Sequence, residues 1–221
     1  MRIHVYNFDS EKNEIMAKKL DIILKPSGRV LSLFGCNHSR VAKTKPAASQ
    51  TLYNSLLDSS PSCFLVETTR KSLDLSIFVW ESRDTSLTHE KFCVEESEFV
   101  ETPAIAAADK LGILFSSIVP IDVDSFKTRK NLAIKMLLHP IESLILISRY
   151  HNAPSDDVDI NEWRNRFRAS CPTAFSILFT ERERHMAEII SAHVKASQGD
   201  VAVLVGLSHL EALHNSLIDH S

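Results

Sequence analysis

Glycine is scarce in this chain, with five residues among 221. Cysteine is also rare: the four cysteines are widely separated and form no Cys-x-x-Cys pair, so we expect no disulfide framework. Long apolar runs are missing as well, because no segment approaches the roughly 18 apolar residues that a membrane span needs. The first residues lack the apolar core of a signal peptide. These absences predict a soluble, cytoplasmic protein with no membrane span.

The charge of the chain is nearly balanced. The net charge of −3 gives no electrostatic reason to expect a nucleic-acid partner. The hydrophobic content of 44% is ordinary for a globular protein, and 221 residues suffice for one large domain or two small ones. We find no internal linker and no tandem repeat, so residues 1–221 are predicted to form a single domain.

Apolar runs of strand type alternate with helical patterns along the chain. Strands are predicted at 30–34, 63–66, 75–80, 113–121 and 201–205. Helices are predicted at about 10–24, 48–57, 103–110, 131–138, 160–168, 181–194 and 207–218, whereas 141–148 fits either type. This alternation predicts an α/β fold: a single-domain sandwich with a central mixed, mostly parallel sheet flanked by helices.

Two of the five glycines stand in copies of one pattern, an apolar strand followed by Gly-x-x-His. The first copy ends in Gly35-Cys36-Asn37-His38 and the second in Gly206-Leu207-Ser208-His209. Glycine allows a sharp turn or a close backbone approach at a strand end. In open α/β sheets, ligands bind at the carboxyl ends of the strands. We therefore predict that both histidines converge at that edge, and that both glycines have a positive φ or a tight backbone contact.

Two further polar residues have a comparable position. Glu67 follows the strand at 63–66, and Arg182 lies in a predicted first helical turn, because Thr180 and Glu183 match a capping box. Histidine and glutamate are suitable ligands for a divalent metal. The planar fork of arginine suits a carboxylate or a developing oxyanion. Two histidines and a carboxylate also suit acid–base chemistry without a metal.

Each of these residues also has an ordinary structural interpretation. A histidine after a strand is more often a hydrogen-bonded structural residue than a ligand. Glu67 fits an ion pair with Arg70, and Arg182 fits a solvated helix face. Asp122 and Asp124 are suitable metal ligands, yet aspartates at strand ends are usually turn residues.

Taken in order, the motifs resemble the TraB/PrgY/Tiki family, which belongs with the erythromycin esterase-like and ChaN-like proteins. Members have a strand ending in Gly-x-x-His, then a strand ending in Glu, then a Glu-Arg-[Asp/Asn] motif opening a helix, and finally a second strand with Gly-x-x-His. The matching segments here are 33–39, 61–67, 180–187 and 205–210. This chain has Cys36-Asn37 after the first glycine and Glu183 where the family often has Asp or Asn.

The resemblance implies a metal-dependent hydrolase, peptidase-like or amidase-like, for which residues 1–221 form one TraB-like domain. By this resemblance His38, Glu67 and His209 hold a divalent metal cation, and His38, Glu67 and Arg182 are the catalytic residues. The partner would be a peptide or small-molecule substrate. Two alternatives stay open: a noncatalytic protein that binds or sequesters a peptide signal, and a metal-free esterase-like enzyme with His38 as general base.

Overall fold

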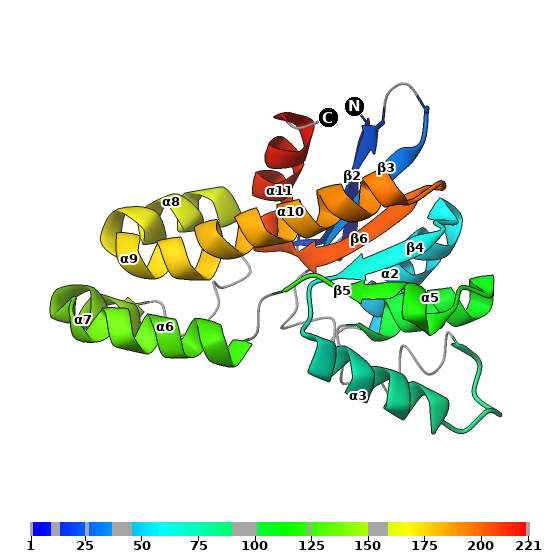
Figure 1. Ribbon diagram of the computed structural model, residues 1–221, viewed down its shortest axis with the longest axis horizontal. Coiled ribbons are helices and arrows are strands. Elements are labelled where there is room, and N and C mark those ends of the chain that lie inside the picture. The colour runs from blue at the N-terminus through cyan, green and yellow to red at the C-terminus, as the bar shows by residue number, and fades with distance from the viewer. Residues whose placement is uncertain are drawn as a thin grey trace.

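The structure is a computed structural model, and it describes residues 2–9, 14–24, 27–36, 46–89, 101–122, 125–149 and 159–219. Within these residues, six strands form one sheet in the order β1-β2-β3-β6-β4-β5 (Figure 1). The strands are β1 Arg2–Asp9, β2 Glu14–Ile23, β3 Val30–Cys36, β4 Cys63–Val66, β5 Ile118–Pro120 and β6 Val201–Gly206. The pairs β3–β6, β6–β4 and β4–β5 are parallel, and β1–β2–β3 is antiparallel. The predicted α/β fold with a mixed, mostly parallel sheet flanked by helices is confirmed.

Helices cover both faces of this sheet. One face packs against α2 Pro46–Ser59, α3 Arg70–Glu81 and α5 Thr102–Leu111, and the other against α10 Glu181–Ala196 and α11 Leu207–Asp219. Successive residues of a strand point to opposite faces. In β6, Ala202 and Leu204 accordingly join the first core, and Val203 and Val205 join the second. A central strand buried on both faces requires the continuous apolar run that β6 has.

The remaining helices form a third apolar cluster beside the sheet. They are α6 Ser125–Leu137, α7 Pro140–Arg149, α8 Ile160–Ser170, α9 Pro172–Phe175 and the π-helical turn η2 Ser176–Thr180; a short 3₁₀ turn η1, Phe115–Ser117, precedes β5. The cluster is rich in aromatic rings: Phe175 and Phe179 stack with centroids 4.9 Å apart, and Phe167 meets both edge-on. This cluster joins α8, α9 and η2 to the helical pair α6–α7.

Two predicted elements have the wrong type. Residues 10–24 were expected to form a helix, but β2 occupies Glu14–Ile23 and pairs with both β1 and β3. Leu20 and Ile22 are buried and Ile23 is exposed, which is the two-residue period of a strand. The strand predicted at 75–80 lies inside α3, whose buried residues Leu73, Ser76 and Trp80 have the three- and four-residue spacing of a helix.

The structure also corrects the predicted strand at 113–121 and the predicted capping box, and it shows the type of the undecided segment 141–148. The strand expected at 113–121 is reduced to β5, after the 3₁₀ turn η1. The undecided segment 141–148 is helical and lies in α7. The predicted capping box is wrong, because η2 runs directly into α10. Thr180 has helical dihedral angles (φ −60°, ψ −47°) and makes no side-chain cap hydrogen bond, so α10 does not begin with a cap at this residue.

The motif glycines Gly35 and Gly206 were predicted to have either a positive φ or a tight backbone contact. Gly35 has a tight contact but no positive φ. Among the described glycines, Gly28 and Gly112 have a positive φ, and Gly35 and Gly206 do not. A Cβ on Gly35, however, would lie 2.8 Å from Leu210 Cδ2. The absence of a side chain at Gly35 therefore lets α11 pack closely on β3.

This close approach makes Gly35 sensitive to substitution. We expect Gly35→Val to lower the free energy of unfolding by about 1–3 kcal/mol, because added carbons overpack a dense core. Gly35→Ala should have a smaller effect in the same direction, since it adds one carbon, which would lie 2.8 Å from Leu210 Cδ2, 3.1 Å from Leu210 Cβ and 3.2 Å from Leu207 Cδ1. Urea denaturation of the two variants measures this. A valine variant as stable as the wild type would contradict the prediction.

Candidate functional site

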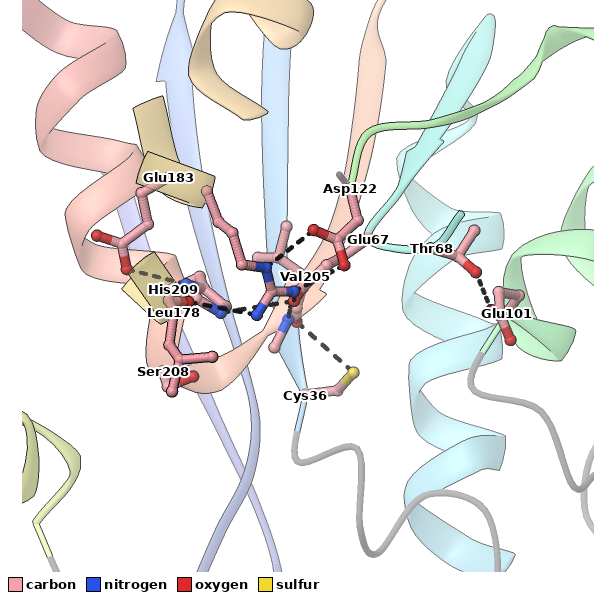
Figure 2. Close-up of polar contacts among 12 residues, drawn as sticks. Cys36, Glu67, Thr68, Glu101, Asp122, Leu178, Glu183, Val205, Ser208 and His209 are labelled. Carbon is pink, nitrogen blue, oxygen red and sulfur yellow. Dashed lines mark hydrogen bonds and ion pairs between the residues drawn. The ribbon is translucent and has the colours of Figure 1, made fainter. Parts of the chain in front are cut away.

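Polar side chains gather at the carboxyl ends of β4 and β6. Glu67 immediately follows β4, and His209 lies in the first turn of α11, directly after β6. Figure 2 shows the side chains of Glu67, Glu183 and His209 at this edge. The parallel pairing of β4 with β6 aligns the two strand ends, so the residues that follow them meet although they are far apart in sequence.

Glu67 is the centre of this group and is almost completely buried, with its side chain 6% exposed. Its Oε1 accepts a hydrogen bond from Arg182 Nη2 at 2.8 Å. Its Oε2 accepts from the backbone N–H of Gly206 at 2.5 Å. His209 Nε2 lies 3.5 Å from the same Oε1 that faces Arg182. Glu67 thus ties the ends of β4 and β6 to α10 and α11.

The guanidinium of Arg182 is bound by two carboxylates. Besides Glu67, it meets Asp122 in a two-pronged contact, with Nε 2.9 Å from Oδ1 and Nη2 2.7 Å from Oδ2. Burial acts to lower the pKa of Arg182, but the hydrogen bond to Asp122 and the negative charge of Glu67 outweigh it and raise the pKa. Arg182 is therefore a permanent cation inside the protein. Arg70, the ion-pair partner suggested for Glu67, lies 3.9 Å from Asp74.

Glu183 holds the imidazole of His209 from its other side. His209 Nδ1 lies 2.9 Å from Glu183 Oε1. A carboxylate only accepts hydrogen bonds, so Nδ1 carries the proton in this contact and Nε2 is presented toward Glu67. His209 is 3% exposed, and Phe179 lies against its ring with centroids 5.2 Å apart. The imidazole is therefore held in one orientation.

Arg164 of α8 completes the group by binding Glu183 with both of its terminal nitrogens. Nη1 lies 2.6 Å from Oε1 and Nη2 3.1 Å from Oε2, and Nη1 also donates to the carbonyl of Ser208. The guanidinium lies over the ring of Phe179 at 4.8 Å. Burial by itself would raise the pKa of Glu183, but the hydrogen bonds from His209 and Arg164 outweigh it and lower the pKa.

The lowered pKa of Glu183 predicts an acid-sensitive fold. A carboxylate whose pKa is depressed on folding contributes stability above its ordinary pKa, here 4.5, and loses it as the pH falls through the folded value. We expect the free energy of unfolding to decline below about pH 4.5 more steeply in the wild type than in Glu183→Gln. Urea denaturation at a series of acidic pH values, in the presence of a chelator, measures both slopes.

Glu211 offers a matched control. The hydrogen bond from Lys18 lowers its pKa as well, but the Glu211 side chain is 46% exposed, so solvent screens its charge. Glu211→Gln should leave most of the acid slope in place. Identical slopes for the wild type and Glu183→Gln would show that Glu183 does not stabilise the folded chain.

A buried thiol and a second carboxylate lie close to the site. Cys36 Sγ lies 3.6 Å from the carbonyl oxygen of Val205, and burial, together with the charges of Glu67 and Glu101, raises the thiol pKa far above its ordinary value. Glu101 in turn accepts a hydrogen bond from the hydroxyl of Thr68. Because the thiolate is the reactive form of cysteine, Cys36 is an inert thiol and not a nucleophile.

Three of the four predicted site residues lie together: Glu67, Arg182 and His209. His38 is outside the described residues, so its position stays a prediction. Asp122, expected as a turn residue or metal ligand, is the partner of Arg182. Glu183, expected in a capping box, binds His209. Nothing local in the sequence marks Arg164.

The residues present fit two ligands of a divalent metal. With bonds of about 2.0–2.2 Å to N and O, two ligands of a tetrahedral ion lie roughly 3.3 Å apart. His209 Nε2 and Glu67 Oε1 are 3.5 Å apart. A carboxylate on the other ring nitrogen, as Glu183 provides here, is the usual support of a metal-binding imidazole. Within the described part of the chain no group of three His, Cys, Asp or Glu residues is arranged for a metal, and the predicted third ligand, His38, lies outside it.

Comparison with models of protein families and with curated proteins finds no match to this chain. Among the described helices, none combines the length and the apolar character needed to cross a membrane. The geometry of the site and the order of the sequence motifs are therefore the observations on which a function can be argued.

Proposed function

We propose that this protein is a metal-dependent hydrolase of the TraB/PrgY/Tiki type that cleaves a peptide or amide bond. The observation that carries the proposal is the orientation of His209. Glu183 holds Nδ1 at 2.9 Å, and Nε2 faces Glu67 at a distance suited to two ligands of one ion. The order of the four sequence motifs, from Gly35 to His209, supports the same conclusion.

In this proposal His209, Glu67 and His38 hold a divalent cation, which when bound activates water and polarises a carbonyl. The contacts of Arg182 favour a positioning role over direct contact with the substrate. Its Nε and Nη2 are engaged by Asp122 and Glu67, so it fixes the Glu67 carboxylate and balances its charge. Glu183 and Arg164 support His209 in the same way.

One observation favours a metal-free alternative. Glu67 already has a cation, Arg182, 2.8 Å from Oε1. An imidazole oriented by a carboxylate is also the arrangement of a general base in hydrolases without a metal. In this second candidate His209 would accept a proton from water, a role that the sequence assigned to His38.

The metal content of the purified protein distinguishes the metal-dependent hydrolase from the metal-free alternative. We expect a stoichiometric divalent transition metal in the wild type, measured by elemental analysis, and hydrolysis of at least one member of a peptide library. His209→Ala should lose both the metal and hydrolysis. His193→Ala is the matched control, because His193 lies outside the site, where its Nδ1 contacts the carbonyl of Ile189.

Each other result points to a different function. Hydrolysis that persists in a metal-free protein would favour the acid–base alternative. Peptide binding without hydrolysis, unchanged in His209→Ala, would favour a protein that sequesters a peptide. A metal retained in His209→Ala would remove His209 from the proposed ligand set.

A further inference from the structure

Exposed apolar side chains gather on the helical pair α6–α7. Eleven large hydrophobic residues are exposed in the described part of the chain, and six of them lie between residues 134 and 147. Their relative exposures range from 52% to 83%, and they are Ile134, Leu137, Leu138, Ile141, Leu144 and Ile147. Folded proteins that act alone rarely expose contiguous apolar patches larger than a few hundred Å². We call this group the α6–α7 patch.

The patch is an outer face of the helical pair. Residues three apart on a helix are neighbours, so Ile141, Leu144 and Ile147 form one stripe along α7. The inner face of the pair packs on the aromatic cluster through Met136 and Ile145. Because the inner residues already hold the helices to the protein, the outer stripe is not needed for the fold. Figure 1 shows α6 and α7 at the left of the molecule, below α8 and α9 in this view.

Basic residues accompany the patch. Residues 125–149 contain five Lys or Arg and one acidic residue, a surplus of four positive charges, although the whole chain has a net charge of −3. Arg129, Lys130 and Arg149 are exposed. The one acidic residue, Glu142, is turned inward, where it accepts hydrogen bonds from the backbone N–H and the hydroxyl of Thr173 at 3.0 and 2.9 Å. The outer face is therefore apolar and cationic, while the rest of the chain is anionic.

We propose that the α6–α7 patch binds the surface of a membrane that contains anionic lipids. Leucine and isoleucine side chains would enter the boundary between headgroups and acyl chains, and the basic residues would contact lipid phosphates. A second copy of this chain fits the patch less well, because a symmetric dimer through one face would bring two cationic surfaces together. This surface association needs no spanning helix and is independent of the proposed hydrolase activity.

Vesicle co-sedimentation of the full chain tests the proposal. We expect binding to vesicles of phosphatidylcholine mixed with phosphatidylserine, little binding to phosphatidylcholine alone, and weaker binding at high salt. Leu138→Glu/Leu144→Glu should lower the affinity by about tenfold or more, since it removes apolar area and adds negative charge. Arg129→Glu/Lys130→Glu should also lower it by about tenfold or more.

Matched variants control for the general effect of new charges. Leu75→Glu/Leu114→Glu replaces two leucines that are 51% and 73% exposed elsewhere on the surface. Lys110→Glu/Lys195→Glu reverses two exposed charges on other helices. Both should bind vesicles like the wild type. Circular dichroism of all four variants checks that each remains folded.

Three results would overturn the proposal. The first is equal binding to both kinds of vesicle, or none to either. The second is a dimer in light scattering that Leu138→Glu/Leu144→Glu dissociates, which would assign the patch to a second copy. The third is binding of an acidic amphipathic peptide, lost in the same variant, by a chain that does not bind vesicles.

Discussion

Arg182→Met is expected to lower the free energy of unfolding by about 3–5 kcal/mol. The variant removes the cation that faces Glu67 and Asp122, whose side chains are only 6% and 13% exposed. Taking away one partner of a buried ion pair leaves charge in a medium that solvates it poorly. Urea denaturation at neutral pH measures the loss.

Arg184→Met is the matched control in the same turn of α10. Arg184 is exposed, so its substitution should change stability by less than about 0.5 kcal/mol. Arg182→Lys should fall between the two, because lysine keeps the charge but loses the fork that meets Asp122. From the sequence alone, Arg182→Lys is expected to leave the melting temperature nearly unchanged. The contacts of Arg182 with Glu67 and Asp122 predict a loss of stability instead. Equal, small effects of all three variants on the free energy of unfolding would indicate that Arg182 lies on a solvated helix face.

Glu183→Ala is expected to lower both stability and metal affinity. It leaves the buried guanidinium of Arg164 without its carboxylate, which costs about 3–5 kcal/mol. It also removes the acceptor for His209 Nδ1, and loss of such a support weakens metal binding by about 10–100-fold. Denaturation and metal titration of the same preparations measure the two effects.

A double variant separates the structural effect from the positioning effect. Arg164→Met/Glu183→Ala removes the cation together with the carboxylate, so much of the lost stability should return. The metal affinity should stay low, because His209 still lacks its partner. Glu181→Ala controls for any change in the same helical turn, since its side chain is 41% exposed and makes only long contacts, with Lys135 at 3.8 Å and with the hydroxyl of Ser176 at 3.5 Å. Full recovery of metal affinity in the double variant would show that Glu183 does not position His209.

The central strands and the residues that follow them can be predicted from the sequence. The runs in β4 and β6 are almost wholly apolar, because both strands are parallel and buried on two faces. A polar residue just after such a strand must lie at the carboxyl edge of the sheet, which is why Glu67 and His209 could be placed correctly. The α/β class followed from the alternation of these strands with helical patterns.

Two segments have a type that follows from contacts with distant parts of the chain. The apolar stretch at 75–80 fits a strand by its length, yet it lies in α3. The buried residues of this helix, Leu73, Ser76 and Trp80, are three and four residues apart, which puts them on one face of a helix but not of a strand. Residues 14–23 follow the period of a strand once β1 and β3 provide hydrogen-bonding partners. Such partners come from elsewhere in the chain, and a short window of sequence does not contain them.

The polar network of the site also depends on the tertiary structure. Arg164 lies in a basic helix, and nothing in its neighbourhood distinguishes it from Arg166, which is exposed and pairs with Glu162. Its role arises because α8 packs against α10 and α11, which brings Glu183 within 2.6 Å. In the same way, Asp122 pairs with Arg182 because β5, which precedes Asp122, lies beside β4 in the sheet. Local sequence determines which residues end the strands, but the packing of distant elements determines which charges are buried together, because burial and pairing are properties of the folded chain.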